Sequence, residues 1–323
     1  MKKNTLFLFL LLWPFIVLTE SFSGYWREMQ REYEKIMRSF SHEVQLENNY
    51  MHPHWRQQRK LMAQIIQGAP DDKIMMRGPV AGSMVRNEFC KTQEYEMAYL
   101  RHCVPKHIQA LLRSFKDTQF GGIQLLCREF NCSINSLGQL FFLARILERN
   151  KIEDINTIIE LGGGYGCLAR IAKMVLPSVT YVILDLPEYI ALQSLYLRST
   201  LPDIKVVVHT ACPEKLETGT INLVPIFFLP NFTIRADIFL SFAALSETPE
   251  FVQKMVIERK FFNAYASYLT GPLNRWGAQY NFENHHIIVD GMRSCYNLCF
   301  AQPMHHFGGK LQSYDIYGTN QVK

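Results

Sequence analysis

The sequence has no pair of cysteines in C-x-x-C spacing, although it contains eight cysteines. Zinc ribbons and thioredoxin-type redox motifs are built on such pairs, so both are excluded. The excess of positive charge is small, because 34 Lys and Arg against 29 Asp and Glu give a net charge of +5. We therefore expect no nucleic-acid partner. Repeats and low-complexity tracts are absent, and 48% hydrophobic with 20% charged residues indicates a globular chain with a sizeable core.

Long hydrophobic runs are missing everywhere except at the start of the chain. Two lysines precede an apolar run from Leu6 to Leu18, which is shorter than the roughly 20 residues that span a bilayer. Residues 1–23 are therefore predicted to be a signal peptide or an uncleaved membrane anchor. The protein is expected to be exported or membrane-associated, or anchored and facing the cytoplasm. Export would permit disulfides, and the candidate pairs by spacing are Cys127 with Cys132 and Cys295 with Cys299.

Residues 24–150 have the pattern of helices and show no strand-like alternation. Apolar residues recur at helical spacing near the start of this segment, as at Tyr25, Met29, Tyr33 and Met37. Further helices are expected at about 88–102, 105–116 and 135–149, and prolines and glycines predict a loop over 70–87. We interpret the segment as a helical cap or accessory domain.

The pattern changes after residue 150. Strands are predicted over Thr157–Leu161, Val179–Leu186, Ile204–His209 and Asp237–Ala243, and helices from Cys167, over Pro187–Thr200 and over about 249–267. Alternating strands and helices indicate an α/β domain over 151–323, with a parallel sheet and helices on both faces. Ligands of such sheets bind beyond the carboxyl ends of the strands.

The glycines after the first strand are placed for ligand binding. Gly162, Gly164 and Gly166 follow Glu160 in an E-x-G-x-G-x-G pattern, so a ligand can approach the backbone without a Cβ in the way. Asp185 ends the second strand, where a carboxylate accepts hydrogen bonds from ribose hydroxyls. Together these residues predict a cofactor that contains adenosine.

Two such cofactors are distinguished by the glycine spacing. The dinucleotide fingerprint G-x-G-x-x-G/A fails from Gly162, because Cys167 stands at its last position. It fits from Gly164 with Ala169 as the last residue, but that residue lies a full turn into the expected helix. This alternative also leaves Glu160 without a role.

At these residues the chain resembles the class I S-adenosylmethionine-dependent methyltransferases, whose first motif is an acidic residue followed by G-x-G-x-G. More narrowly, it is similar to the sugar O-methyltransferase family over about residues 155–270. The motifs that carry this resemblance are Ile159-Glu-Leu-Gly-Gly-Gly-Tyr-Gly166, Tyr181-Val-Ile-Leu-Asp-Leu-Pro-Glu188, Leu195-Tyr-Leu197 and Ser241-Phe-Ala-Ala-Leu-Ser-Glu247.

The resemblance implies a Rossmann-like methyltransferase sheet, S-adenosylmethionine as cofactor and a sugar or glycan hydroxyl as acceptor. Gly162, Gly164 and Gly166 would line the methionine part of the cofactor. Asp185 would hold the ribose, and Glu160 would help position the amino group. The simpler interpretation is a tight turn followed by a helix-capping aspartate.

Candidate catalytic residues follow the fourth predicted strand. Methyl transfer to a hydroxyl needs a held acceptor oxygen and a base for its proton. Glu247 is expected at the carboxyl rim, with His285 and His286 in a later loop, as a base and its orienting group or as ligands of a divalent ion. Alternatively, Glu247 belongs to a helix start and the histidines have no chemical role. No metal site is predicted. Aromatic and planar side chains suggest an acceptor wall at Tyr265, Tyr268, Asn274, Arg275 and Trp276.

Three functions remain open at this point. The first is methylation of a sugar or glycan hydroxyl, and the second is a nicotinamide-dependent oxidoreductase. The third is a non-catalytic binding protein on the same fold, which the hydrophobic start favours because the methyl donor is made in the cytosol.

Overall fold

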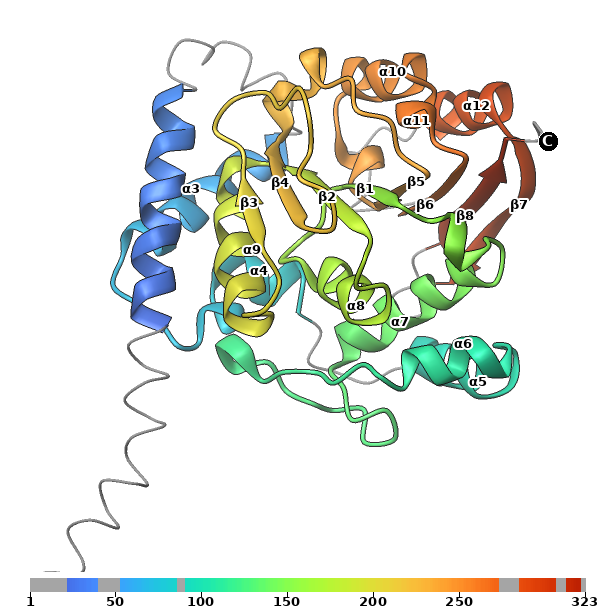
Figure 1. Cartoon of the computed structure of the whole chain (residues 1–323), viewed down its shortest axis with the longest axis horizontal. Helices are drawn as coiled ribbons and strands as arrows, with labels where there is room; N and C mark the ends of the chain where they lie inside the picture. Colours follow the sequence, from blue (N-terminus) through green and yellow to red (C-terminus); the bar gives the residue numbers. More distant parts are fainter. Residues whose placement is uncertain (1–21, 40–52, 86–90, 273–284, 306–311, 321–323) are drawn as a thin grey trace, which may run out of the picture.

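The computed structural model describes residues 22–39, 53–85, 91–272, 285–305 and 312–320. One eight-stranded sheet with helices packed on both faces organises these residues, as predicted (Figure 1). The strands are β1 Thr157–Leu161, β2 Thr180–Asp185, β3 Val206–Val208, β4 Ile221–Pro225, β5 Ile238–Phe242, β6 Ala266–Pro272, β7 Asn297–His305 and β8 Gln312–Thr319.

The sheet order is β3-β4-β2-β1-β5-β6-β8-β7. Strands β1 to β6 are mutually parallel, and β8 pairs antiparallel with both β6 and β7. In the central register, Ile159 lies opposite Val182 on one side and Phe239 on the other. Because β-branched and apolar residues fill both faces here, these strands are buried on both sides.

Helices cover the sheet in two groups. They are 22–39, α3 Pro53–Gln67, α4 Gly78–Ser83, α5 Lys91–His102, α6 Lys106–Leu112, α7 Ile134–Leu147, α8 Cys167–Val175, α9 Pro187–Thr200, α10 Glu250–Glu258, α11 Lys260–Asn263 and α12 His285–Cys295. One core joins α7, α8, α9 and the preceding helices to one face of the sheet. The other core lies between α10 to α12 and the opposite face.

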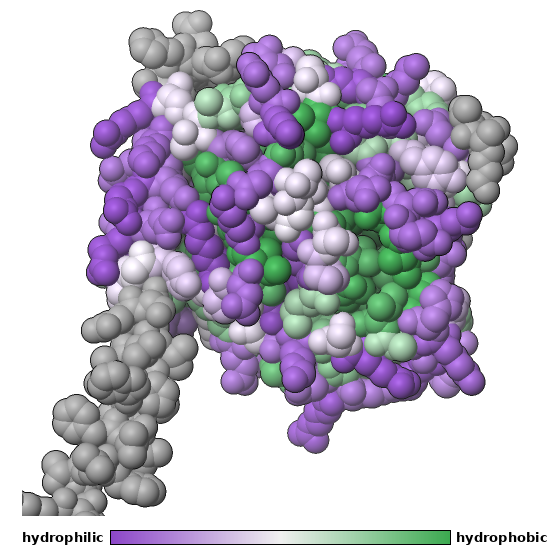
Figure 2. Space-filling view, viewed as in Figure 1, coloured by the Kyte–Doolittle hydropathy of each residue, from purple (hydrophilic) through white to green (hydrophobic). Residues whose placement is uncertain are grey.

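The helices before residue 150 and the later sheet share one continuous core. Buried residues of these helices, such as Trp26 and Phe141, belong to the same core as Ile158, Tyr181 and Tyr317 of the sheet. Arg145 of α7 forms a buried ion pair with Asp315 of β8. Figure 1 shows helix 22–39 alongside α9, and Glu32 joins Arg198 of α9 at 2.8 Å. Figure 2 shows hydrophilic residues over the outside of helix 22–39, whereas hydrophobic ones gather nearer the middle of this face.

Several local predictions were wrong. The segment 70–87 was expected to be a loop but contains a 3-10 turn, Ile74–Met76, and α4. The helix expected over 249–267 ends at Glu258, because residues 260–263 are left-handed, with φ between 50° and 61°. Strand β6 then begins at Ala266. Strands β4, β6, β7 and β8 were not predicted.

Two further expectations concern the cysteines and the hydrophobic start. Cys127 and Cys132 face each other across an antiparallel bridge, and both are free thiols, as are Cys295 and Cys299. The segment 1–21 lies outside the described residues, and residues 22 and 23 begin helix 22–39. Among the described residues, none of the helices has the length and apolar character needed to cross a membrane.

Candidate functional site

The topology places the candidate site at the carboxyl ends of β1, β2 and β5. Strand β1 pairs with β2 on one side and β5 on the other. The chain leaves β1 toward β2 and returns to its other side only with β5, so this is the switch point of the sheet. Gly162 follows β1 directly, Asp185 ends β2, and Ala244 follows β5.

The glycine turn after β1 has a backbone that only glycine adopts readily. Gly162, Gly164 and Gly166 have φ of 79°, 58° and 94°. A Cβ on Gly162 would lie 2.0 Å from that of Ala244, so the loops after β1 and β5 touch. Gly166 is the left-handed residue before α8, and its N–H donates to the Gly163 carbonyl at 2.9 Å. The backbone of residues 162–164 remains partly exposed.

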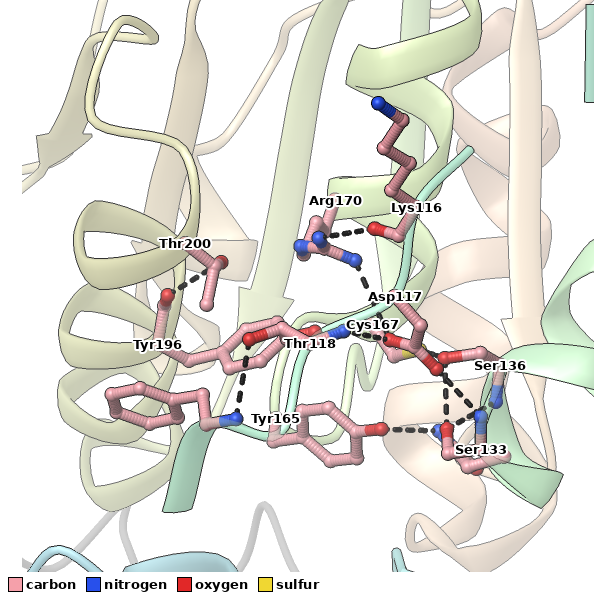
Figure 3. Close-up of polar contacts among 12 residues, drawn as sticks. Lys116, Asp117, Thr118, Ser133, Ser136, Tyr165, Cys167, Arg170, Tyr196 and Thr200 are labelled. Atoms are coloured by element: carbon pink, nitrogen blue, oxygen red, sulfur yellow. Dashed lines mark hydrogen bonds and ion pairs between the residues drawn. The ribbon is translucent and has the colours of Figure 1, made fainter. Parts of the chain in front are cut away.

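Tyr165 fixes this turn to the neighbouring helices through a buried side chain. Its ring is 2% exposed and meets Tyr196 edge to face with centroids 4.9 Å apart. Its hydroxyl accepts a hydrogen bond from Asn135 of α7 at 2.9 Å. Figure 3 shows the polar cluster around it, in which Cys167 lies near Ser136. The helices before residue 150 therefore hold the glycine turn in place.

Arg170 of α8 ties the same cluster to the loop before α7. Its guanidinium lies 3.5 Å from Asp117 and donates to the Lys116 carbonyl at 2.6 Å (Figure 3). Asp117 in turn accepts from the backbone of Ser133 at 2.7 Å, and Ser133 caps α7.

Asp185 lies beside the glycine turn. Its carboxylate is 8% exposed and accepts hydrogen bonds from the Leu186 backbone at 2.8 Å and from Gln193 Nε2 at 2.7 Å. The same Gln193 nitrogen donates to the Gly164 carbonyl at 2.8 Å. One side chain of α9 therefore joins Asp185 and the turn. Burial raises the pKa of Asp185 to about 7, although its hydrogen bonds lower it.

Glu160 is a second buried carboxyl next to the turn. It is 3% exposed and accepts a hydrogen bond from the Tyr181 hydroxyl at 2.9 Å. Burial raises the pKa of Glu160 to about 8, against the lowering effect of Tyr181. A Cβ on Gly163 would lie 3.2 Å from its Oε2. The carboxyl is thus in reach of the turn but is not open to solvent.

Helix α3 contacts the site on two sides, after β2 and after β5. The sequence did not indicate these contacts. Arg59 binds Glu188, at the start of α9, through two hydrogen bonds of 2.6 and 2.9 Å. Trp55 donates its indole N–H to Glu247 Oε2 at 3.1 Å and meets Tyr189 edge to face at 5.8 Å. Helix α3 therefore contacts the start of α9, which follows β2, and the 3-10 turn that follows β5.

Of the three candidate catalytic residues, Glu247 is the one whose side chain the structure describes. Glu247 ends the 3-10 turn Leu245–Glu247 at the rim, as predicted for its position. His285 and His286, expected in a loop, begin α12, and their side chains lie outside the described part. Helix α12 packs on α10, β7 and β8. Tyr268 is buried in the core and Tyr265 is exposed; the rest of the expected acceptor wall, residues 274–276, is not described.

The described residues offer no group of three or more His, Cys, Asp or Glu that would hold a metal ion. One part of the rim is apolar and partly buried. Its side chains come from the ends of β2, β4 and β5 and are Leu186, Phe228, Phe242, Ala243 and Ala244. Gln193 Oε1 and the Tyr189 hydroxyl, both buried, have no hydrogen-bond partner among the described residues. Polar atoms of this kind next to Asp185 fit a ligand with a ribose.

A family model for an O-methyltransferase domain matches residues 126–211. The match covers β1, the glycine turn, Asp185 and α9. It supports a class I methyltransferase. It also supports S-adenosylmethionine as the cofactor. No curated protein sequence matches the chain.

Solved structures are similar to the chain only at low identity. A Thermoplasma acidophilum protein has 12% identity and a TM-score of 0.41, covering 67% of this chain and 98% of its own. The magnesium protoporphyrin IX methyltransferase of Synechocystis PCC 6803, with bound SAM, has 10% identity and a TM-score of 0.41, covering 73% and 100%. Mitomycin 7-O-methyltransferase has 10% identity and a TM-score of 0.34, covering 57% of each chain.

Proposed function

We propose that the chain is an S-adenosylmethionine-dependent O-methyltransferase that acts on a sugar or glycan hydroxyl. The observation that carries the proposal is the bridge through Gln193, which brings Asp185 and the glycine turn to one place at the switch point of the sheet. The O-methyltransferase match over 126–211 supports the reaction class. The sugar acceptor rests on the sequence resemblance over 155–270.

Different residues would bind the methyl donor and take the proton of the acceptor. The Asp185 carboxylate would accept hydrogen bonds from the ribose hydroxyls, and the backbone of 162–164 would lie along the methionine part. The bound cofactor supplies the electrophilic methyl group. Glu247, at the rim beyond β5, would take the proton of the acceptor hydroxyl. The Trp55 indole N–H donates to Glu247 Oε2 and so helps to orient this carboxyl group.

Calorimetric titration with S-adenosylhomocysteine tests donor binding. We expect the full-length protein to give a clear binding heat and Asp185→Ala to lose it. Asp203→Ala is the matched control, since Asp203 is exposed in the loop before β3, and it should bind like the parent. Affinity of the parent should fall as the pH drops below about 7, because Asp185 becomes protonated there. No binding by the parent would reject the proposal.

The reaction itself is tested with a methyl-labelled donor and a panel of glycans. Transfer of label to a hydroxyl, lost in Glu247→Gln with donor binding retained, is the expected result. Donor binding without transfer to any glycan would instead favour the non-catalytic binding protein.

The location of the enzyme is also a proposal. An anchor formed by residues 1–23 with the domain facing the cytoplasm would give it access to the donor. Membrane fractionation followed by protease digestion of intact cells would show protection of the domain, and digestion from outside would contradict this arrangement.

A further inference from the structure

Gln193 holds a central position in the candidate donor site. It lies on α9 and is completely buried. Its amide nitrogen donates to Asp185 Oδ2 at 2.7 Å and to the Gly164 carbonyl at 2.8 Å. An amide nitrogen carries two hydrogens, so both are used in these bonds. The orientation of the amide is thereby fixed, and its oxygen is the acceptor that is left over.

The leftover oxygen is buried next to a second polar atom of the same kind. Gln193 Oε1 and the Tyr189 hydroxyl have no hydrogen-bond partner among the described residues, and Tyr189 is 2% exposed. The two residues are four positions apart on α9 and so lie on the same face of the helix. Buried polar atoms are normally satisfied. Two unsatisfied ones beside the Asp185 carboxylate indicate a place where a ligand completes the hydrogen bonds.

We propose that Gln193 and Tyr189 are further donor-binding residues. Gln193 fixes the Asp185 carboxylate relative to the glycine turn, and its oxygen accepts a hydrogen bond from an N–H or O–H of the donor. The Tyr189 hydroxyl bonds the same ligand. The inference rests on the proposed function, because it assigns these residues to the site of the methyl donor.

Gln193→Met tests the assignment, since it keeps the length of the side chain and removes both polar atoms. We expect it to weaken S-adenosylhomocysteine binding roughly 10- to 100-fold, as a lost hydrogen bond to a charged group does. Gln253→Met is the matched control. Gln253 is also fully buried with an unsatisfied Oε1, but its nitrogen donates to the Thr248 carbonyl. The control should keep the parent affinity.

Two further measurements separate a role in the site from a role in stability. Asp185 loses a hydrogen-bond donor in Gln193→Met, so the pH at which binding weakens should move upward from about 7. Tyr189→Phe removes one oxygen and should weaken binding by a few fold without this pH shift. Titration with methylthioadenosine, which lacks the amino acid part, shows which donor group Gln193 binds. A retained effect of Gln193→Met shows that Gln193 acts on the adenosine part, directly or through Asp185, and a lost effect shows that it acts on the amino acid part.

The outcomes distinguish this inference from the proposed function. If Asp185→Ala loses binding while Gln193→Met and Tyr189→Phe stay within twofold of the parent, the inference is overturned and the proposed function stands. An equal loss in Gln253→Met would also overturn it, because the effect would then be general. If the parent does not bind S-adenosylhomocysteine, the proposed function itself fails. Should Gln193→Met not fold, Tyr189→Phe decides alone.

Discussion

Arg59→Met should strongly destabilise the protein. The Arg59 and Glu188 side chains are only 10% and 3% exposed, and they share two short hydrogen bonds. Removing the guanidinium leaves a buried carboxylate without its cation, which costs about 3–5 kcal/mol. A domain is stable by about 5–15 kcal/mol in total, so this single change removes a large share. In thermal unfolding, the midpoint should fall by roughly 5–15 °C.

A double variant separates loss of the pair from loss of packing. In Arg59→Met/Glu188→Met both charges are gone, and an apolar pair of similar volume is often close to neutral. We expect the double variant to recover most of the stability, less about 1 kcal/mol for the Tyr33 hydroxyl that also donates to Glu188. Arg38→Met is the control, because its pair with Glu34 is exposed and contributes about 0.5 kcal/mol or less. Denaturant titration of Arg59→Met, Glu188→Met, the double variant and the control gives these values. A double variant as unstable as the sum of the single losses would refute this reasoning.

Three more predictions concern the backbone and the second buried carboxyl. Gly162→Ala should destabilise the protein more than Gly164→Ala in denaturant titration, because both have positive φ but only the first meets Ala244 at 2.0 Å; equal losses would contradict this. Lys260→Gly should raise the free energy of unfolding by about 1 kcal/mol in denaturant titration, since Lys260 is exposed with φ of 50°. Its control, Glu258→Gly in the preceding helix, should lower that free energy by up to about 1 kcal/mol. The pKa of Glu160 is raised to about 8, so the folded protein binds an extra proton and its stability should fall as pH rises from about 4.5 to 8. Thermal unfolding of Glu160→Gln across that range should show a flatter decline, and an unchanged slope would exclude this assignment.

The parts of the fold that could be predicted have local signals. Strands β1 and β2, the glycine turn and α9 follow one another with breakers between them, and Pro187 marks the start of α9. The expectation that Asp185 lies beside the glycine turn follows from the geometry of parallel strands, whose carboxyl ends share one edge.

The missed strands lack such signals. Strand β4 runs into the apolar 3-10 turn Ile226–Asn231 without a polar break. Strand β7 contains Pro303, which argues against a strand in sequence but is tolerated at the edge of the sheet, where β7 lies. The end of α10 depends on a left-handed turn of non-glycine residues, which local propensity disfavours and the buried rings of Phe261 and Phe262 hold in place.

The contacts of α3 with the two sides of the site could not be predicted for a different reason. Trp55 and Glu247 are 192 residues apart, and Arg59 and Glu188 are 129 apart. Contacts of this range follow from packing of whole helices, and a single sequence has no pattern that records them. The same holds for Gln193, because a glutamine in a helix is common and only the fold shows that it contacts Asp185 and Gly164.

The pair of Arg145 and Asp315 has a consequence for biosynthesis. The two residues are 170 positions apart, so at common translation speeds α7 leaves the ribosome roughly 10–30 s before β8 exists. A guanidinium destined for burial has to stay hydrated during that delay. Asp315 lies on β8, which stands between β6 and β7. Closure of α7 over this part of the sheet is therefore a late event, and β6 remains the open edge of the sheet until β8 is made.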